Sequence, residues 1–417
     1  MTSVDCDLLI RQGRVLYTGD QPLDIAIAGG RIVAIAPHLP HSGRQEIDAQ
    51  GLLVSPPFVE SHIHLDSAMT AGRPRWNESG TLFEGIQIWA DYKAEMTVEE
   101  VQSRAIATLK KQASQGILFV RTHADVCDPQ FIALKGLLAA KEALRDWMYI
   151  QVVAFPQDGI YSQSANAELL EESLNLGADA VGGIPHYELT REDGVRSIEY
   201  IFALAQKYNK LIDIHCDEVD DDHSRFLEVV TANAIRTGMG SMVTASHTTA
   251  FGSYNDAYAL KLMGFLSRTD LNFVANPLIN ITLQGRTDTY PKRRGITRVK
   301  ELWQQGQNVS LGHDCIQDPW YNLGTGNMLD VAFMAVHACH MTGRGEVNAC
   351  YDMITNNGAE TLAIDEYGIA VGLPANLIIL DAPDQFTAIQ NRSVARYVIS
   401  RGQIISKTLP TQTESSL

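Results

Sequence analysis

The chain has 417 residues, of which 45% are hydrophobic and 20% are charged, as expected for a globular protein with one large domain and an appendage, or with two domains. Its net charge of −16 disfavours a nucleic acid polymer as partner, because phosphate binding needs a basic surface, and no apolar run reaches membrane-spanning length. The six cysteines form no C-x-x-C pair and the first residues lack a signal-peptide pattern, so we expect a cytoplasmic protein without disulfides.

The first segment of the chain predicts short strands separated by turns. The β-rich runs cover residues 7–10, 13–17, 25–27 and 30–35. Runs this few and this short do not make a stable sheet alone, so the segment needs a partner elsewhere in the chain.

The middle of the chain repeats one rhythm, a short β-rich run followed by an amphipathic helical pattern, as at residues 98–115, 195–210 and 224–237. The β-rich runs cover residues 58–64, 116–125, 149–155, 180–185, 211–217, 242–247, 271–276 and 308–314. Eight such units in series predict an α/β fold, a (β/α)8 TIM-type barrel. A doubly wound open sheet is the alternative, and no Gly-x-Gly-x-x-Gly follows the first strand to support it.

The last segment resembles the first in its pattern. Short β-rich runs cover residues 376–380, 396–400 and 403–406. We expect both ends to combine into a small β-sandwich domain, made of residues 1–56 and 370–417, beside a barrel domain of residues 57–369.

The motif His62-Ile63-His64 ends the first barrel strand. Side chains at i and i+2 of a strand point to the same side, so both imidazoles can meet at one point. Later strands also end in polar groups, at Gln157, His215, His247 and Asp314. Because active-site groups of such barrels lie at the carboxyl ends of the strands, the combination predicts a metal site, although a single such histidine is more often a core residue.

Three neutral imidazoles and one carboxylate suit Zn2+ or Fe2+, either of which makes hydroxide available near neutral pH. Glu218 lies three residues after His215 and is predicted to shuttle protons beside the metal rather than bind it. We expect His123 and His186 to be supporting or structural residues, and Cys216 to point into the core.

These residues lie within stretches that resemble the amidohydrolase superfamily, and within it the bacterial cytosine deaminase family. The resemblance extends over nearly the whole chain and is carried by residues 57–66, 79–85, 153–157, 211–218, 244–249, 273–277, 288–297 and 312–314. It implies a homohexamer that acts on a small pyrimidine base.

The resemblance also implies roles for individual residues. One divalent metal ion would be held by His62, His64, His215 and Asp314, with Glu218, His247 and Asp314 as catalytic groups. Glu218 would be the acid and base, and His247 would orient the attacking hydroxide. Gln157 would pair with the amide edge of the base, between ring walls formed by Leu82, Phe155 and Trp320.

The reaction expected from this arrangement is hydrolytic deamination at C4 of cytosine or 5-methylcytosine, giving uracil or thymine plus ammonia. Metal-activated hydroxide would attack C4 while Glu218 protonates N3. Glutamine offers one donor and one acceptor, which match the N1–H and O2 of the base.

Cys315 departs from the resembling family, whose cytosine deaminases carry Asp directly after the metal-binding Asp. A thiol is softer and less polar than a carboxylate, so it tolerates a 5-methyl group better. We therefore predict 5-methylcytosine as a good substrate, while a change without consequence in a plain cytosine deaminase remains the alternative.

Other functions stay open at this point. Isoguanine, isocytosine or a creatinine-type cyclic amidine also presents an amide edge to Gln157. A two-metal cyclic-amide hydrolase would need a bridging lysine on the fourth strand, where residues 180–186 contain none, and zinc deaminases with Pro-Cys-x-x-Cys are excluded. A metal-binding protein without catalysis would leave Glu218, His247 and Gln157 unexplained.

Overall fold

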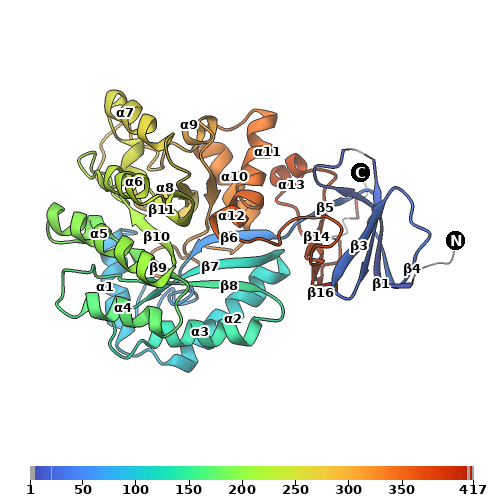
Figure 1. Cartoon of the computed structure of the whole chain (residues 1–417), viewed down its shortest axis with the longest axis horizontal. Helices are drawn as coiled ribbons and strands as arrows, with labels where there is room; N and C mark the ends of the chain where they lie inside the picture. Colours follow the sequence, from blue (N-terminus) through green and yellow to red (C-terminus); the bar gives the residue numbers. More distant parts are fainter. Residues whose placement is uncertain (1–4, 20, 411–413, 416–417) are drawn as a thin grey trace.

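The computed structural model describes residues 5–19, 21–410 and 414–415. These residues form two units, each built around a β-sheet (Figure 1). The larger unit is a parallel sheet of eight strands in sequence order, covered by helices. Its strands are β6 (Phe58–Ile63), β7 (Ile117–Asp125), β8 (Tyr149–Phe155), β9 (Ala180–Gly183), β10 (Leu211–Cys216), β11 (Val243–His247), β12 (Asn272–Ala275) and β13 (Val309–Leu311). The barrel predicted from the sequence is confirmed.

The helices that follow the barrel strands bury one apolar face against the sheet. They are α1 (Leu82–Lys93), α2 (Val98–Ser114), α3 (Ile132–Leu144), α4 (Asn166–Asn175), α5 (Arg191–Tyr208), α6 (Phe226–Thr237), α7 (Asp256–Leu266), α8 (Pro277–Leu283), α9 (Val299–Gln304), α10 (Met328–Ala338), α11 (Arg344–Asp352) and α12 (Asn356–Thr361), with the 3-10 turns η1 (Pro185–Tyr187), η2 (Gly240–Met242) and η3 (Thr249–Gly252). α5 begins earlier than its apolar pattern predicts because the Thr190 side chain caps it by accepting from the Asp193 N–H. Among the described residues, no helix combines the length and apolarity needed to cross a membrane.

The barrel closes between β6 and β13 through the residues that carry the predicted metal ligands. His62 O accepts from Asp314 N at 2.8 Å, and Asp314 O accepts from His64 N at 2.9 Å. The buried Glu60 carboxyl adds a second link, since Oε1 accepts from His313 N at 2.8 Å and from His62 N at 3.3 Å. The first and last strands are thus joined at the end of the barrel where the candidate site lies.

Glu60→Gln is expected to stabilise the protein at alkaline pH. Burial raises the pKa of Glu60 to about 8, so the folded state keeps a proton that the unfolded chain loses above about pH 4. That difference lowers the stability of the wild type as the pH rises from about 4 to 8. Glutamine removes this slope. Gln112 Nε2 donates to Glu60 Oε2 at 3.3 Å in the wild type, so the Gln112 amide has to turn over in the variant, which brings its Oε1, buried without a partner among the described residues, to the new NH2 group.

The measurement is the unfolding free energy of both proteins at pH 5 and pH 8. The advantage of Glu60→Gln over the wild type should grow by up to about 4 kcal/mol between these values, at about 1.4 kcal/mol per unit. An advantage that does not change with pH would show that Glu60 is ionised in the folded state.

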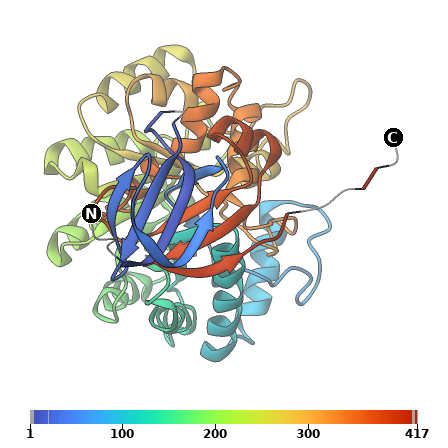
Figure 2. The ribbon, with the colours of Figure 1, turned by 90° about the vertical axis from the view of Figure 1, so that its right-hand side faces the viewer.

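The smaller unit is a mixed sheet to which both ends of the chain contribute, and its blue and red strands lie side by side in Figure 2. The strands are β1 (Asp5–Val15), β2 (Leu23–Ala28), β3 (Arg31–Ala36), β4 (Ser42–Asp48), β5 (Leu53–Ser55), β14 (Leu377–Leu380), β15 (Ala395–Ser400) and β16 (Gln403–Lys407). The two ends join where β5 pairs with β14. We propose residues 1–56 and 370–417 as one domain, although α13 (Gln385–Asn391) contacts α10 and α11 of the barrel.

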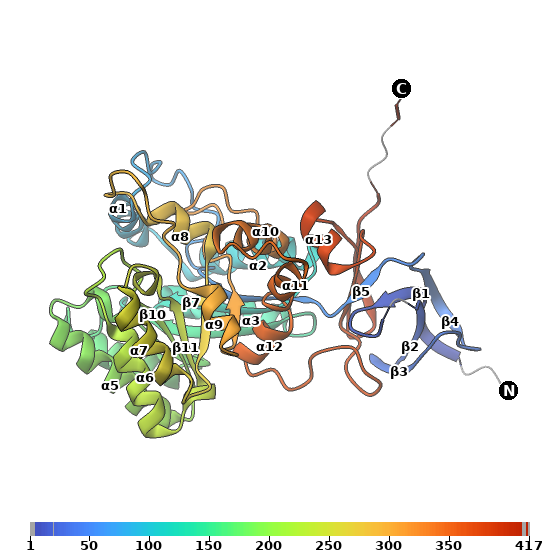
Figure 3. The same cartoon turned by 90° about the horizontal axis from the view of Figure 1, so that it is seen from above.

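Two details of this sheet differ from the pattern in the sequence. The runs at residues 7–10 and 13–17 belong largely to one strand, β1, which continues through an irregularity at Gln12, where φ is +55°. β4 was not predicted, because its sequence is polar and mostly exposed. It forms through backbone pairing with β1 instead of through an apolar face. Figure 3 shows this sheet beyond one end of the barrel.

Candidate metal and substrate site

Four side chains predicted as metal ligands meet at one point at the carboxyl end of the barrel. His64 Nε2 lies 3.0 Å from His215 Nε2 and 3.5 Å from Asp314 Oδ1. His62 Nε2 lies 3.8 Å from the same Asp314 oxygen. Nitrogen and oxygen atoms this close, contributed by β6, β10 and the segment after β13, form a donor set suited to one divalent cation.

The orientation of the His62 ring fits this reading. Its Nδ1 lies 3.1 Å from Ser246 Oγ, whereas Nε2 is buried and has no hydrogen-bond partner among the described residues. A buried polar atom without a partner costs free energy, so such an atom directed into a cluster of donors fits a bound metal ion.

The electrostatic environment also favours the ligating forms. Burial, together with the neighbouring imidazoles, lowers the pKa of His62 and His215 well below the usual value, so both rings are neutral. Burial and the nearby Glu218 carboxyl raise the pKa of Asp314. A divalent cation at this point would stabilise the carboxylate and the neutral imidazoles together.

Glu218 and His247 lie against this cluster. Glu218 Oε1 is 3.2 Å from His247 Nδ1, and His247 Nε2 is 3.7 Å from Asp314 Oδ2. Asn280 fixes the histidine tautomer. Its Oδ1 accepts from Asn276 N, so its amide group faces His247 Nδ1 at 3.0 Å and places the ring proton on Nε2.

The Glu218 carboxyl is therefore set up to carry a proton. A carboxylate facing the lone pair of His247 Nδ1 would be repelled, whereas a protonated carboxyl would not. Burial also raises the pKa of Glu218, which favours the protonated carboxyl as well. A buried carboxyl with a raised pKa beside a metal cluster is typical of a group that transfers protons.

Three of the residues at the strand ends have a left-handed backbone that side chains disfavour. Asp217, His247 and Asp314 have φ of +52°, +67° and +69°. The Asp217 carboxylate accepts from the backbone N–H groups of Phe226 and Leu227, which anchors the turn that carries Glu218. Strained conformations held in this way cluster at functional sites.

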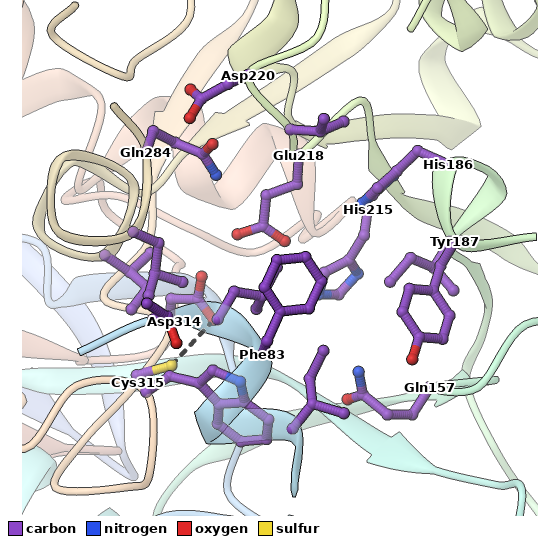
Figure 4. A pocket seen from close by; sticks show the side chains of 18 of the residues that line it. Phe83, Gln157, His186, Tyr187, His215, Glu218, Asp220, Gln284, Asp314 and Cys315 are labelled. Carbon is purple, nitrogen blue, oxygen red and sulfur yellow. Dashed lines mark hydrogen bonds between the residues drawn. The ribbon is translucent and has the colours of Figure 1, made fainter. Parts of the chain in front are cut away.

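A cavity of about 410 Å³ opens beside the cluster (Figure 4). Its lining includes every residue predicted to contact the substrate: Leu82, Phe155, Gln157, Cys315 and Trp320. His64, His215, Glu218 and Asp314 also line it, whereas His62 and His247 do not. Phe155 stacks on the His215 ring at 4.1 Å, so it packs against a predicted ligand as well as the cavity.

One side of the cavity is apolar. Cys315 is buried with Ile279 and Leu283, and Leu82 and Trp320 pack against them. The Trp320 ring also packs closely over Gly85 of α1, where an added Cβ would lie 2.5 Å from its Cδ1 atom. Gln157 lies on another side of the cavity, as Figure 4 shows.

The sequence did not identify several of the lining residues. Ile279, Leu283 and Gln284 come from α8 and its end, and Tyr187 comes from η1. His186, also in η1, was expected to be a supporting or structural residue, and it lines the cavity. The residues of η1 could have been predicted from the sequence because they follow strand β9 closely. The sequence of α8, by contrast, has only the pattern of an ordinary helix. His123 was expected to be a supporting or structural residue. The centroid of its ring lies 4.1 Å from that of the His62 ring, and it does not line the cavity.

The chain is similar to known amidohydrolases in sequence and in structure. The sequence profile of the amidohydrolase family matches residues 45–406. A curated relative, N-isopropylammelide isopropyl amidohydrolase of Pseudomonas sp. (strain ADP), is 31% identical over 97% of this chain and 98% of its own.

Two solved structures are similar over nearly their full length. The 5-methylcytosine deaminase from Klebsiella pneumoniae, liganded with 5-fluorocytosine, has 45% identity and a TM-score of 0.95 over 98% of this chain and 99% of that chain. The N-isopropylammelide isopropylaminohydrolase from Burkholderia multivorans has 26% identity and a TM-score of 0.84 over 96% and 98%.

Proposed function

This chain belongs to the amidohydrolase family, and we propose that it hydrolytically deaminates a free aminopyrimidine base at C4, acting on cytosine and 5-methylcytosine. The observation that carries the proposal is one cavity whose lining includes three proposed metal ligands, His64, His215 and Asp314, together with Glu218 and Gln157. The similarity to a 5-methylcytosine deaminase supports the same substrate class.

We propose that His62, His64, His215 and Asp314 hold one divalent ion, Zn2+ or Fe2+. The donor set of neutral imidazoles and one carboxylate suits either metal. When bound, such an ion supplies a nucleophile at neutral pH by lowering the pKa of a water molecule to about 7.

The proton steps fall to Glu218 and His247. In the proposal, Glu218 donates its proton to N3 of the base as a hydroxyl group adds to C4. The carboxylate then takes the proton of this new hydroxyl group and passes it to the amino group, which leaves as ammonia while the C4 carbonyl forms. His247, with its proton on Nε2, directs this hydrogen towards the nucleophile near Asp314. Because its pKa is raised, the Glu218 side chain can be both a protonated donor and a carboxylate acceptor near neutral pH, as the two proton transfers require.

Gln157 and the ring walls would orient the base. The amide of Gln157 offers one donor and one acceptor to O2 and N1–H. Leu82, Phe155 and Trp320 line the cavity, and in the proposal they enclose the planar ring. A site that relies on paired hydrogen bonds discriminates strongly against analogues that lack them.

The apolar side of the cavity supports acceptance of a 5-methyl group. Cys315, Ile279 and Leu283 offer sulfur and hydrocarbon surface there. Each buried methyl group contributes about 0.8 kcal/mol. We propose that the C5 position of the base faces this surface and that 5-methylcytosine is a good substrate.

On the basis of the resemblance, we also propose that the protein forms a homohexamer. We propose the cytoplasm as its cellular compartment. All six cysteines are free in the structure, which agrees with a reducing compartment.

An ammonia-release screen on protein of measured metal content tests the function. The panel is cytosine, 5-methylcytosine, isoguanine, isocytosine and creatinine, each of which would release ammonia. N-isopropylammelide is added because of the 31% identical relative, and its turnover is followed by release of isopropylamine, which is its leaving group. We expect turnover of the two cytosines, with uracil and thymine as products. Turnover of another compound alone would replace the proposed substrate, and fully metallated protein inactive on the whole panel would contradict the proposal.

A further inference from the structure

A chain of buried hydrogen bonds runs away from the metal cluster into the centre of the barrel. His62 Nδ1 lies 3.1 Å from Ser246 Oγ, and Ser246 Oγ donates to Asp213 Oδ1 at 2.6 Å. All three side chains are fully buried and none of them lines the cavity. The substrate therefore cannot account for this polar arrangement.

Asp213 is in turn paired with Arg121, which is also fully buried. Arg121 Nη1 donates to Asp213 Oδ2 at 3.1 Å and to Thr244 Oγ1 at 3.0 Å. Its remaining groups donate to Gln151 Oε1 and to Thr361 O at 3.0 and 2.8 Å. An ion pair buried this deeply contributes little net stability, so its rigid anchoring calls for another explanation.

The direction of the hydrogen bonds provides one. The carboxylate of Asp213 can only accept, so the Ser246 hydroxyl must donate to it and present its lone pair to His62. The proton of the His62 ring then lies on Nδ1. The lone pair of Nε2 is left free, and Nε2 has no hydrogen-bond partner among the described residues although it lies 3.8 Å from Asp314 Oδ1.

We propose that Arg121, Asp213 and Ser246 are positioning residues that hold His62 in its metal-binding tautomer and orientation and increase the basicity of Nε2. The inference rests on the proposed ligation of metal by His62. A carboxylate that accepts a hydrogen bond from the non-ligating ring nitrogen of a metal-binding histidine typically increases metal affinity about 10- to 100-fold. Here the carboxylate acts through a serine hydroxyl and is held by a buried guanidinium.

Ser246→Ala tests the chain at its central link, and Ser310→Ala is its matched control. Ser310 is equally buried on β13, and its hydroxyl bonds to Phe273 O and Thr361 without contacting the metal cluster. Both variants lose one buried hydroxyl from a barrel strand, so a merely structural effect should be similar in the two.

The dissociation constant for Zn2+ is measured by competition with a chelator, together with the rise in Tm that the metal produces. We expect Ser246→Ala to bind Zn2+ about 10- to 100-fold more weakly than the wild type and to show a smaller rise in Tm. Ser310→Ala should keep the wild-type affinity even if its metal-free Tm falls.

Equal Zn2+ affinity in Ser246→Ala and the wild type would overturn the inference, as would an equal weakening in both variants. Neither result would affect the proposed deamination, which the substrate screen tests on its own. Conversely, a wild type that binds Zn2+ through Ser246-dependent ligation yet deaminates nothing would remove the function and leave the inference standing.

Discussion

Glu218→Gln is expected to keep a full equivalent of metal and to lose about 10²- to 10⁴-fold in kcat. Glutamine has nearly the same size and shape, so the cavity and the cluster behind it should persist. It cannot carry an exchangeable acidic proton, so neither the transfer to N3 nor the transfer to the leaving amino group can occur through this side chain.

Because Glu218 lies beside His247, we expect its replacement to slow the chemical step and to leave substrate binding largely unchanged. The carboxyl lies 3.2 Å from His247 Nδ1 but is not among the proposed ligands. The loss should therefore appear in kcat and kcat/KM with little change in KM, as expected when an interaction of the transition state is removed.

Steady-state kinetics and metal analysis of the same preparation provide the test. Asp220→Asn is the control, because Asp220 also lines the cavity but accepts from Gly285 N away from the imidazoles. Its kcat should stay within a few-fold of the wild type. Near-normal turnover in Glu218→Gln would remove this residue from the proton steps, and loss of metal would place it among the ligands.

The parts of the site that the sequence predicts are those that strand geometry determines. His62 and His64 stand two residues apart at the end of β6, and His215, His247 and Asp314 lie at or shortly after the ends of other strands. Parallel pairing therefore brings all five to one end of the barrel. The boundaries of β8 match the prediction at residues 149–155. Most of the other barrel strands differ only at their ends, where backbone pairing stops before the apolar pattern does.

The parts that the sequence does not predict depend on packing between elements that are distant in the chain. Ile279 and Leu283 lie one turn apart on the same face of α8, as in any amphipathic helix. Only the placement of this helix brings them beside Cys315. Ser246 and Asp213 are likewise small polar interruptions in apolar strands. Their link to His62 depends on which strands are neighbours and on the direction of each hydrogen bond.

Cys315→Asp is expected to shift selectivity from 5-methylcytosine towards cytosine by about 10- to 200-fold in the ratio of kcat/KM values, the range that one group in a pocket usually supplies. Burial raises the pKa of the Cys315 thiol, so the side chain is neutral where it meets Ile279 and Leu283. An aspartate here would bring a carboxylate next to Asp314, whose Oδ1 lies 3.6 Å from Cys315 Sγ.

The physical reason for the shift is desolvation. A carboxylate at position 315 needs water or a donor, and a methyl group at C5 would displace that water without replacing its hydrogen bonds. A hydrogen at C5 leaves room for it. The same substitution should therefore harm 5-methylcytosine more than cytosine, rather than lower both values equally.

Cys315→Ala separates charge from volume. Alanine keeps the surface apolar and enlarges the space near C5, so this variant should retain its activity on 5-methylcytosine while Cys315→Asp loses it. Steady-state kinetics on both bases, with metal content measured because position 315 adjoins Asp314, gives the two ratios. An unchanged ratio in Cys315→Asp, or a wild type that strongly prefers unsubstituted cytosine, would mean that the substrate C5 position faces another part of the cavity.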